Sequence, residues 1–204
     1  MGIFSRKTDT AAPAAADFDA PTTAVADISG DYNLDPAHTR LGFSARHAMV
    51  TTVRGSFKEF EGTAHVDTAN PANSKVSLKI DSASVDTGNK DRDNHLLSGD
   101  FFENAANPYI TFDSTSVEFD GETWEITGDL TIKGVTKPVT IPFELTGSAK
   151  DPFGNTRVGF EGATTINRSE WGLNFNATLE TGGLLVSEKI KLEFDVSAIK
   201  VENA

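Results

Sequence analysis

From about residue 30 onward, apolar and polar side chains alternate along the chain with a period of two. In residues 189–198, apolar side chains occupy every even position and charged or hydroxyl side chains every odd position. Successive side chains of a strand point to opposite faces, so this pattern gives one apolar face and one hydrated face. It predicts half-buried antiparallel strands.

The same alternation recurs through the rest of the chain, in residues 41–47, 76–80, 110–112, 124–132 and 139–145. Turn signals such as Asp120-Gly121 and Lys133-Gly134 separate these segments, as in a meander of hairpins. One stretch has helical character, from about Thr87 through Leu97, and Gly99 ends it. The pattern therefore predicts an all-β fold in which eight or so strands close into a barrel or stack as two sheets.

Phenylalanine is the main large apolar residue, with 14 Phe against 2 Trp and 2 Tyr. A Phe ring is large and has no polar group, so the predicted interior is unusually apolar. Two interpretations stay open from composition alone. The rings fill an ordinary core, or they line a cavity, since a closed barrel of eight strands has room for one small ligand.

Composition argues against several classes of function. The 18 Lys and Arg against 30 Asp and Glu give a net charge of -12, whereas binding to nucleic acid or an anionic membrane needs a clustered cationic excess. With no cysteine, disulfides, thiolate nucleophiles and zinc-thiolate sites are excluded. The 4 His are widely separated and lack the i, i+4 spacing of a zinc protease helix, so we expect no metal and no cofactor.

The first 29 residues differ in composition from the rest and are rich in Ala, Asp, Thr and Pro. Such a segment cannot bury enough apolar surface to order itself, so we predict a disordered tail at 1–29 and one folded domain at 30–204. No long apolar run is present, which predicts a soluble protein without a transmembrane segment. The charges of the first residues follow the apolar patch, the reverse of a secretory signal, so we expect a cytoplasmic location.

No catalytic arrangement can be identified from the residues. The chain has no Gly-x-Ser-x-Gly elbow, and its glycine-rich segments at 159–162 and 181–183 lack the Lys of a phosphate-binding loop. His47 lies on the same face of its predicted strand as Leu41 and Phe43. It is therefore either a core histidine bonded to a backbone carbonyl or a hydrogen-bond donor inside a pocket.

Several short motifs, taken together, resemble the signature of the YceI-like family of lipocalin-shaped lipid-binding proteins. They lie between about residues 30 and 200 in the family's order, at 38–43, His47, Gly55-x-Phe57, Arg92-Asp93-x-His95-Leu96, Asp100-Phe101-Phe102, Pro108-x-Ile110-x-Phe112, 128–139, Asn167-Arg168 and Trp171-Gly172. The resemblance implies an extended eight-stranded antiparallel lipocalin-like barrel with a short helical cap. It also implies an elongated apolar ligand, such as a polyisoprenoid or related lipid, and no established catalysis. Many members of the family are exported.

We therefore predict non-catalytic binding, sequestration or transport of a polyisoprenoid or isoprenoid-quinone type of lipid in the barrel. Inward parity gives the predicted lining, and two arginines are candidates for an anionic head group or for structural ion pairs. The candidate ligand-binding residues are Phe43, His47, Phe57, Leu78, Ile80, Arg92, Phe101, Phe112, Leu130, Ile132, Phe143, Arg168, Leu192 and Phe194. The alternatives are an enzyme acting on a small apolar substrate in the same cavity, and a structural protein with a filled core. Apolar residues near the barrel mouth are compatible with a homodimer.

Overall fold

The computed structural model describes residues 27–180 and 182–202, and most of the predicted tail lies outside them. Strands dominate, and all of their pairings are antiparallel. The strands are β1 (Gly30–Leu34), β2 (Arg40–His47), β3 (Thr51–Phe57), β4 (Phe60–Val66), β5 (Lys75–Asp81), β6 (Val85–Asp86), β7 (Tyr109–Phe119), β8 (Thr123–Ile132), β9 (Val135–Lys150), β10 (Thr156–Asn167) and β11 (Val186–Lys200). The helical elements are α1 (Lys90–Leu97) and the 3-10 turns Pro71–Asn73, Ser82–Ser84 and Arg168–Trp171.

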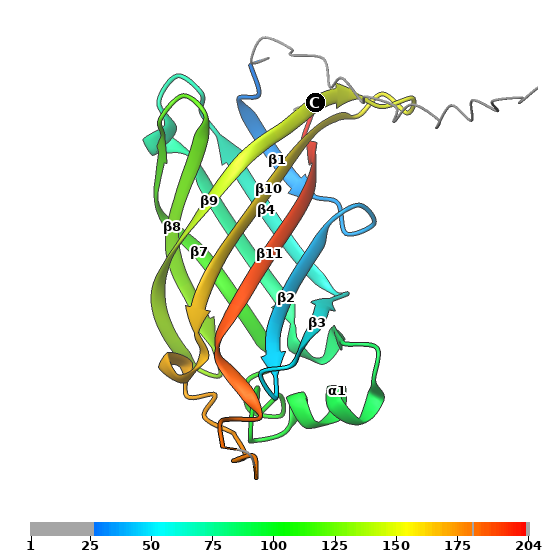
Figure 1. Cartoon of the computed structure of the whole chain (residues 1–204). Helices are drawn as coiled ribbons and strands as arrows, with labels where there is room; N and C mark the ends of the chain where they lie inside the picture. The colour runs from blue at the N-terminus through cyan, green and yellow to red at the C-terminus, as the bar shows by residue number, and fades with distance from the viewer. Residues whose placement is uncertain (1–26, 181, 203–204) are drawn as a thin grey trace, which may run out of the picture.

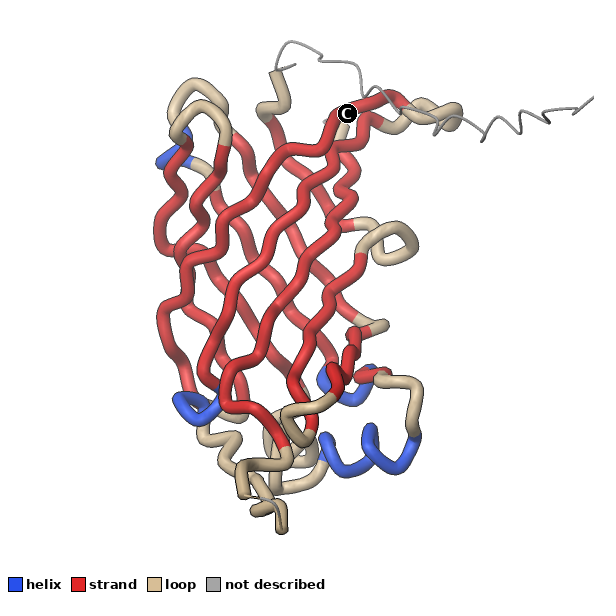
Figure 2. The backbone as a smooth tube through the Cα atoms, in the orientation of Figure 1, coloured by secondary structure: helices blue, strands red, loops and turns tan. Residues whose placement is uncertain are grey.

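Eight of these strands close into a barrel (Figure 1). The order runs from β1 through β4, β5, β7, β8, β9 and β10 to β11, and β11 pairs again with β1. Because β1 is only 5 residues long, it covers one end of the 15-residue β11. The hairpin of β2 and β3 pairs with the rest of β11 and continues the wall (Figure 2). The predicted eight-stranded antiparallel barrel is confirmed.

The helix α1 lies at one end of the barrel, where the sequence predicted a cap (Figure 1). The helix begins at Lys90, three residues after the start predicted at about Thr87. The side chain of Asn89 accepts a hydrogen bond from the backbone N–H of Arg92 and so caps the first turn. Thr87 lies before the helix, and its backbone N–H and hydroxyl donate to the carboxylate of Asp93 in the first turn. At 8 residues α1 is far too short to cross a bilayer, and no other helix in residues 27–180 and 182–202 is long and apolar enough.

The opposite end of the barrel is filled by a second group of buried side chains, which we call the far-end plug. Its members are Ile28, Tyr32, Val117, Trp124, Val158 and Ala198. The phenol of Tyr32 donates to the carbonyl of Ile28 at 2.7 Å, and burial raises the pKa of that phenol. Ile28 is only 2% exposed, so the packed domain begins before Gly30, the predicted boundary.

Truncation tests where the domain begins. Removing residues 1–26 should leave the melting temperature unchanged, whereas removing residues 1–29 should lower the free energy of unfolding by about 2 to 3 kcal/mol. The longer deletion exposes the site of Ile28 and removes the acceptor of the Tyr32 phenol. Thermal unfolding of both variants checks this. Equal stability of the two would mean that Ile28 contributes nothing to the plug.

Candidate functional site

The barrel encloses one long cavity of about 610 Å³. It extends from His47 and Val186 at the α1 end to Tyr32 and Val158 at the far-end plug. Along β11 this span covers residues 186–198, roughly 40 Å of strand at about 3.3 Å per residue. The wall is built almost wholly from aliphatic and aromatic side chains. Such a space suits an elongated apolar molecule.

All of the candidate ligand-binding residues predicted from the sequence lie on the wall of this cavity. Those placed by inward parity are Phe43, His47, Phe57, Leu78, Ile80, Phe112, Leu130, Ile132, Phe143, Leu192 and Phe194, and those from the cap and loops are Arg92, Phe101 and Arg168. Cross-strand pairing explains the agreement, since Leu192 pairs with Phe43 and residues that pair share a face. That these residues contact a ligand stays a prediction.

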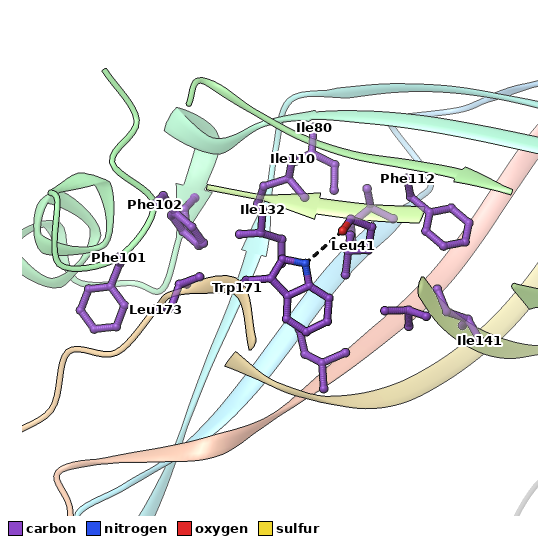
Figure 3. Close-up of a cluster of buried hydrophobic side chains, with 14 residues drawn as sticks. Leu41, Ile80, Phe101, Phe102, Ile110, Phe112, Ile132, Ile141, Trp171 and Leu173 are labelled. Carbon is purple, nitrogen blue, oxygen red and sulfur yellow. Dashed lines mark hydrogen bonds between the residues drawn. The ribbon is translucent and has the colours of Figure 1, made fainter. Parts of the chain in front are cut away.

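Trp171 also lines the cavity, although it is not among the residues predicted to do so. It is 2% exposed, and its indole N–H donates to the carbonyl of Leu130 at 3.0 Å (Figure 3). Trp171 ends a 3-10 turn, and the next residue, Gly172, has a φ of 73° that suits glycine. A period-two pattern cannot find it, because the side chain enters the barrel from a turn and not from a strand. Leu173 and Phe175, which follow on the same loop, were missed for the same reason.

The mouth of the cavity lies at the α1 end, where exposed residues of α1 and of the β2–β3 hairpin line it together with residues of the described segments 173–180 and 182–186. Phe101 and Phe102, which follow α1, are buried and line the cavity there. The ring of His95 stands edge-on to Phe101 at 5.2 Å and to Phe175 at 4.7 Å, so it joins the helix to the opposite loop. Its Nε2 lies 2.8 Å from a carboxylate oxygen of Asp100. These contacts narrow the entrance on one side.

On the other side of the mouth, the β2–β3 hairpin ends in a strained turn. The N–H of Val50 donates to the carbonyl of His47, and the two residues between them, Ala48 and Met49, have φ values of 50° and 59°. Positive φ at both positions favours Asn-Gly, and other L-residues cost about 1 to 2 kcal/mol each. The guanidinium of Arg46 holds the turn by donating to the carbonyls of Met49 and Val50.

The structure overturns the interpretation of His47 as a core histidine. Its ring is exposed at the mouth, and its side chain has no hydrogen bond to any residue of the described chain. The predicted face is correct, since His47 lies on the same inward face of β2 as Phe43. The barrel opens at this level, however, so inward parity no longer means burial.

Two arginines also reach the mouth. Arg168 is buried, and its guanidinium donates to the backbone carbonyls of Leu173 and Ser187. Burial lowers the pKa of Arg168. Arg92, on α1, donates to the hydroxyl and the carbonyl of Thr87, both at 2.7 Å. Neither arginine forms an ion pair with a residue in the described ranges, so the predicted structural ion pairs are not what holds them.

Residues 32–198 match the model of the YceI-like domain. The chain belongs to the YceI-like family. Protein YceI of Escherichia coli is 39% identical over 175 residues, which cover 85% of this chain and 88% of that protein. The crystal structure of Burkholderia cenocepacia BcnA is similar with a TM-score of 0.71 and 25% identity, covering 80% of this chain and 98% of BcnA. A polyisoprenoid binding domain from Saccharophagus degradans shares the fold, with a TM-score of 0.63 at 17% identity over 83% of this chain and 98% of that one.

Several of the motifs that carried the resemblance gather at the mouth of this YceI-like barrel. Arg92 and His95 lie on α1, Phe101 follows it, and Arg168 and Trp171 lie on the turn after β10. They line one end of one cavity, although they are up to 79 residues apart in the sequence. In the described residues no three His, Asp or Glu side chains are grouped as metal ligands.

Proposed function

We propose that this YceI-like protein binds an elongated apolar lipid, of the polyisoprenoid or isoprenoid-quinone type, inside its barrel. The observation that carries this proposal is the cavity of about 610 Å³, which is apolar along its length and reaches the exposed side chains of His47 and Asp91 at the α1 end. A chain-like ligand can lie along the barrel axis with one end at the mouth. The fold neighbour from Saccharophagus degradans, described as a polyisoprenoid binding domain, supports the same ligand class.

Apolar burial supplies the affinity in this proposal. Each CH₂ group removed from water contributes about 0.8 kcal/mol, so on the order of ten buried groups contribute roughly 8 kcal/mol before the costs of binding. A net gain of about 8 kcal/mol corresponds to micromolar affinity, so a ligand that buries more than ten such groups reaches it after the costs of binding. We propose sequestration or transport without catalysis. In residues 27–180 and 182–202 the hydrogen bonds of the histidine rings go to Asp side chains, and no Ser or Thr hydroxyl is bonded to a histidine ring.

Extraction of the purified full chain with organic solvent, followed by mass spectrometry, tests the proposal. We expect a lipid of one isoprenoid class in a ratio of about one per chain. The same extraction after delipidation and incubation with a prenyl alcohol should recover that alcohol. An empty barrel that takes up no prenyl alcohol would contradict lipid binding and favour a filled-core structural role. Chemical conversion of the added alcohol would favour the enzyme alternative.

The arginines at the mouth predict a preference for an anionic head group. Charge-assisted hydrogen bonds contribute about 1.5 to 3 kcal/mol each, so a prenyl phosphate should bind at least tenfold more tightly than its neutral alcohol. Arg92→Gln should reduce that preference about tenfold, since this half-buried side chain lines the cavity and only its Nε and Nη2 donate to Thr87 in the described residues. Titration calorimetry with both ligands measures it.

A matched control shows whether Arg92 recognises the head group or only stabilises the cavity wall. Lys90→Gln removes an exposed charge from the same helix outside the cavity and should leave the preference unchanged. If Arg92→Gln weakens the alcohol and the phosphate equally, Arg92 supports the wall through Thr87 and does not recognise a head group.

A further inference from the structure

The local charge of the β2–β3 hairpin is opposite to that of the protein. Residues 36–58 contain Arg40, Arg46, Arg54 and Lys58 but no Asp or Glu, in a chain with a net charge of -12. Lys58 lies 3.6 Å from Asp86, and Arg40 is the strand partner of Asp195. Each of these two cations thus has an acid beside it.

The remaining cations, Arg46 and Arg54, lie nearest the tip of the hairpin and are exposed. Neither forms an ion pair within residues 27–180 and 182–202. Thr52 is the strand partner of Arg46. Arg54 is two residues beyond Thr52 on β3, and strand geometry places the two Cα atoms about 7 Å apart. On the neighbouring segment Glu180 and Glu188 are partly offset by Lys189. The α1 side of the mouth carries Asp91, Asp93 and Asp100 against Lys90 and Arg92, so the hairpin is the cationic side of the rim.

The tip between these cations is apolar and exposed. Met49 is 63% exposed and Val50 75%. Leu184, 40% exposed, belongs to the same rim, because the carbonyl of its neighbour Leu185 accepts a hydrogen bond from the N–H of Ala48 at 2.7 Å. We call Met49, Val50 and Leu184 the apolar rim. It borders the mouth of the cavity directly, since Leu185 and His47 line that cavity.

The stability of the folded chain does not explain why Ala48 and Met49 occupy this turn. The positive φ values of Ala48 and Met49 would suit Asn-Gly better, and the side chain of Met49 buries little surface in return. A long apolar side chain is thus held in water on a strained turn, and Arg46 fixes that turn by its bonds to Met49 and Val50. A gain outside the isolated chain would explain this arrangement.

We propose that the apolar rim docks the barrel onto the surface of an anionic lipid bilayer. Exposed aliphatic side chains at a turn, with Arg46 bonded to that turn and Arg54 about 13 Å further along β3, match the boundary between acyl chains and anionic head groups. The rim inserts among the acyl chains, and Arg46 and Arg54 lie at the level of the lipid phosphates. The net charge of the whole chain, from which we expected no membrane binding, does not describe this one face.

Docking in this way would bring the mouth of the cavity to the membrane. A lipid could then pass between the bilayer and the barrel without crossing water, because the rim and the entrance are adjacent. The docking itself does not require the proposed lumenal ligand. Vesicle binding can therefore fail while the barrel still binds its lipid. Equally, the protein can bind vesicles while its barrel takes up no lipid.

Flotation of the full chain with vesicles tests the proposal. Wild type should bind vesicles of about equal parts phosphatidylcholine and phosphatidylglycerol and not vesicles of phosphatidylcholine alone, and salt at about 0.5 M should release it. The double variant Met49→Ser, Val50→Ser should weaken binding about tenfold or more. Arg54→Gln should weaken it about fivefold. Arg54 is the better choice for removing a charge, because Arg46 also holds the turn.

Two controls keep the result specific. Phe153→Ser removes an aromatic side chain that is 89% exposed on the β9–β10 turn, at the other end of the barrel from α1, and should leave binding unchanged (Figure 1). The pair Ala48→Asn, Met49→Gly should raise the melting temperature by about 2 to 4 °C and still weaken vesicle binding. A more stable protein that binds less cannot be explained by damage to the fold.

Three outcomes would overturn the proposal. The first is equal binding of wild type to neutral and anionic vesicles, or none to either. The second is equal loss of binding in the Phe153 and Met49–Val50 variants. The third is a dimer in vesicle-free solution that the Met49–Val50 variant dissociates, as measured by sedimentation, which would make the rim an interface between copies of the chain.

Discussion

Leu192→Glu should empty the barrel of lipid while leaving it folded. Leu192 is half-buried on the inner face of β11 beside Phe43 and lines the cavity. The strand partners of a carboxylate there are Phe43 and Thr164, so it meets no cation beside it and at most one hydroxyl. It also loses its hydration when an apolar chain enters, a penalty of several kcal/mol. Affinity for a prenyl alcohol should fall at least a hundredfold. Mass spectrometry of the extracted protein and fluorescence titration measure the two effects.

The adjacent residue provides the matched control. Lys191 is exposed on the outer face of the same strand, where it lies 3.0 Å from Glu193. Lys191→Glu makes a larger change in charge but should leave affinity within about twofold. The Leu192→Glu variant should also regain lipid as the pH falls, because burial raises the pKa of a carboxyl group and favours its neutral form. Equal loss of lipid in both variants would mean that the assignment of faces is wrong.

Trp171→Ala should have the largest effect on stability. The indole is 2% exposed and packs among buried side chains such as Ile132 and Leu173 near the mouth (Figure 3). Loss of a buried Trp side chain lowers the free energy of unfolding by about 3 to 5 kcal/mol. For a domain of this size, each kcal/mol lowers the melting temperature by about 2 to 4 °C, so we expect a loss of about 10 °C.

The variant Trp171→Phe separates packing from hydrogen bonding. It retains a large ring but loses the N–H that donates to the carbonyl of Leu130. The hydrogen bond itself contributes about 1 kcal/mol, so this variant should lose less than half as much stability as Trp171→Ala. Calorimetry measures both. If the two variants lost the same amount, the hydrogen bond and not the packing of the ring would set the stability.

The strand pattern determined the fold class because its cause is local. In β11, Leu192 and Phe194 alternate with Lys191 and Glu193, and the pleat of any strand sends such residues to opposite faces. The inward assignment therefore needed no knowledge of partner strands. The predicted cap followed from the helical pattern that ends near Leu97, and its start was misplaced because Asn89, a better N-cap than Thr87, begins the helix.

Only the tertiary structure decided what happens at the two ends of the barrel. Residues from separate turns and loops meet there, as Trp171 does with Leu130 and Ala48 with Leu185, and these contacts have no period in the sequence. Burial at the ends also departs from parity, since His47 is exposed at the open mouth although its parity is inward. The sequence by itself determined the faces of the strands and the apolar character of the interior. Closure of the sheet determined the cavity, its mouth and the residues on its rim, because these depend on which distant segments lie side by side.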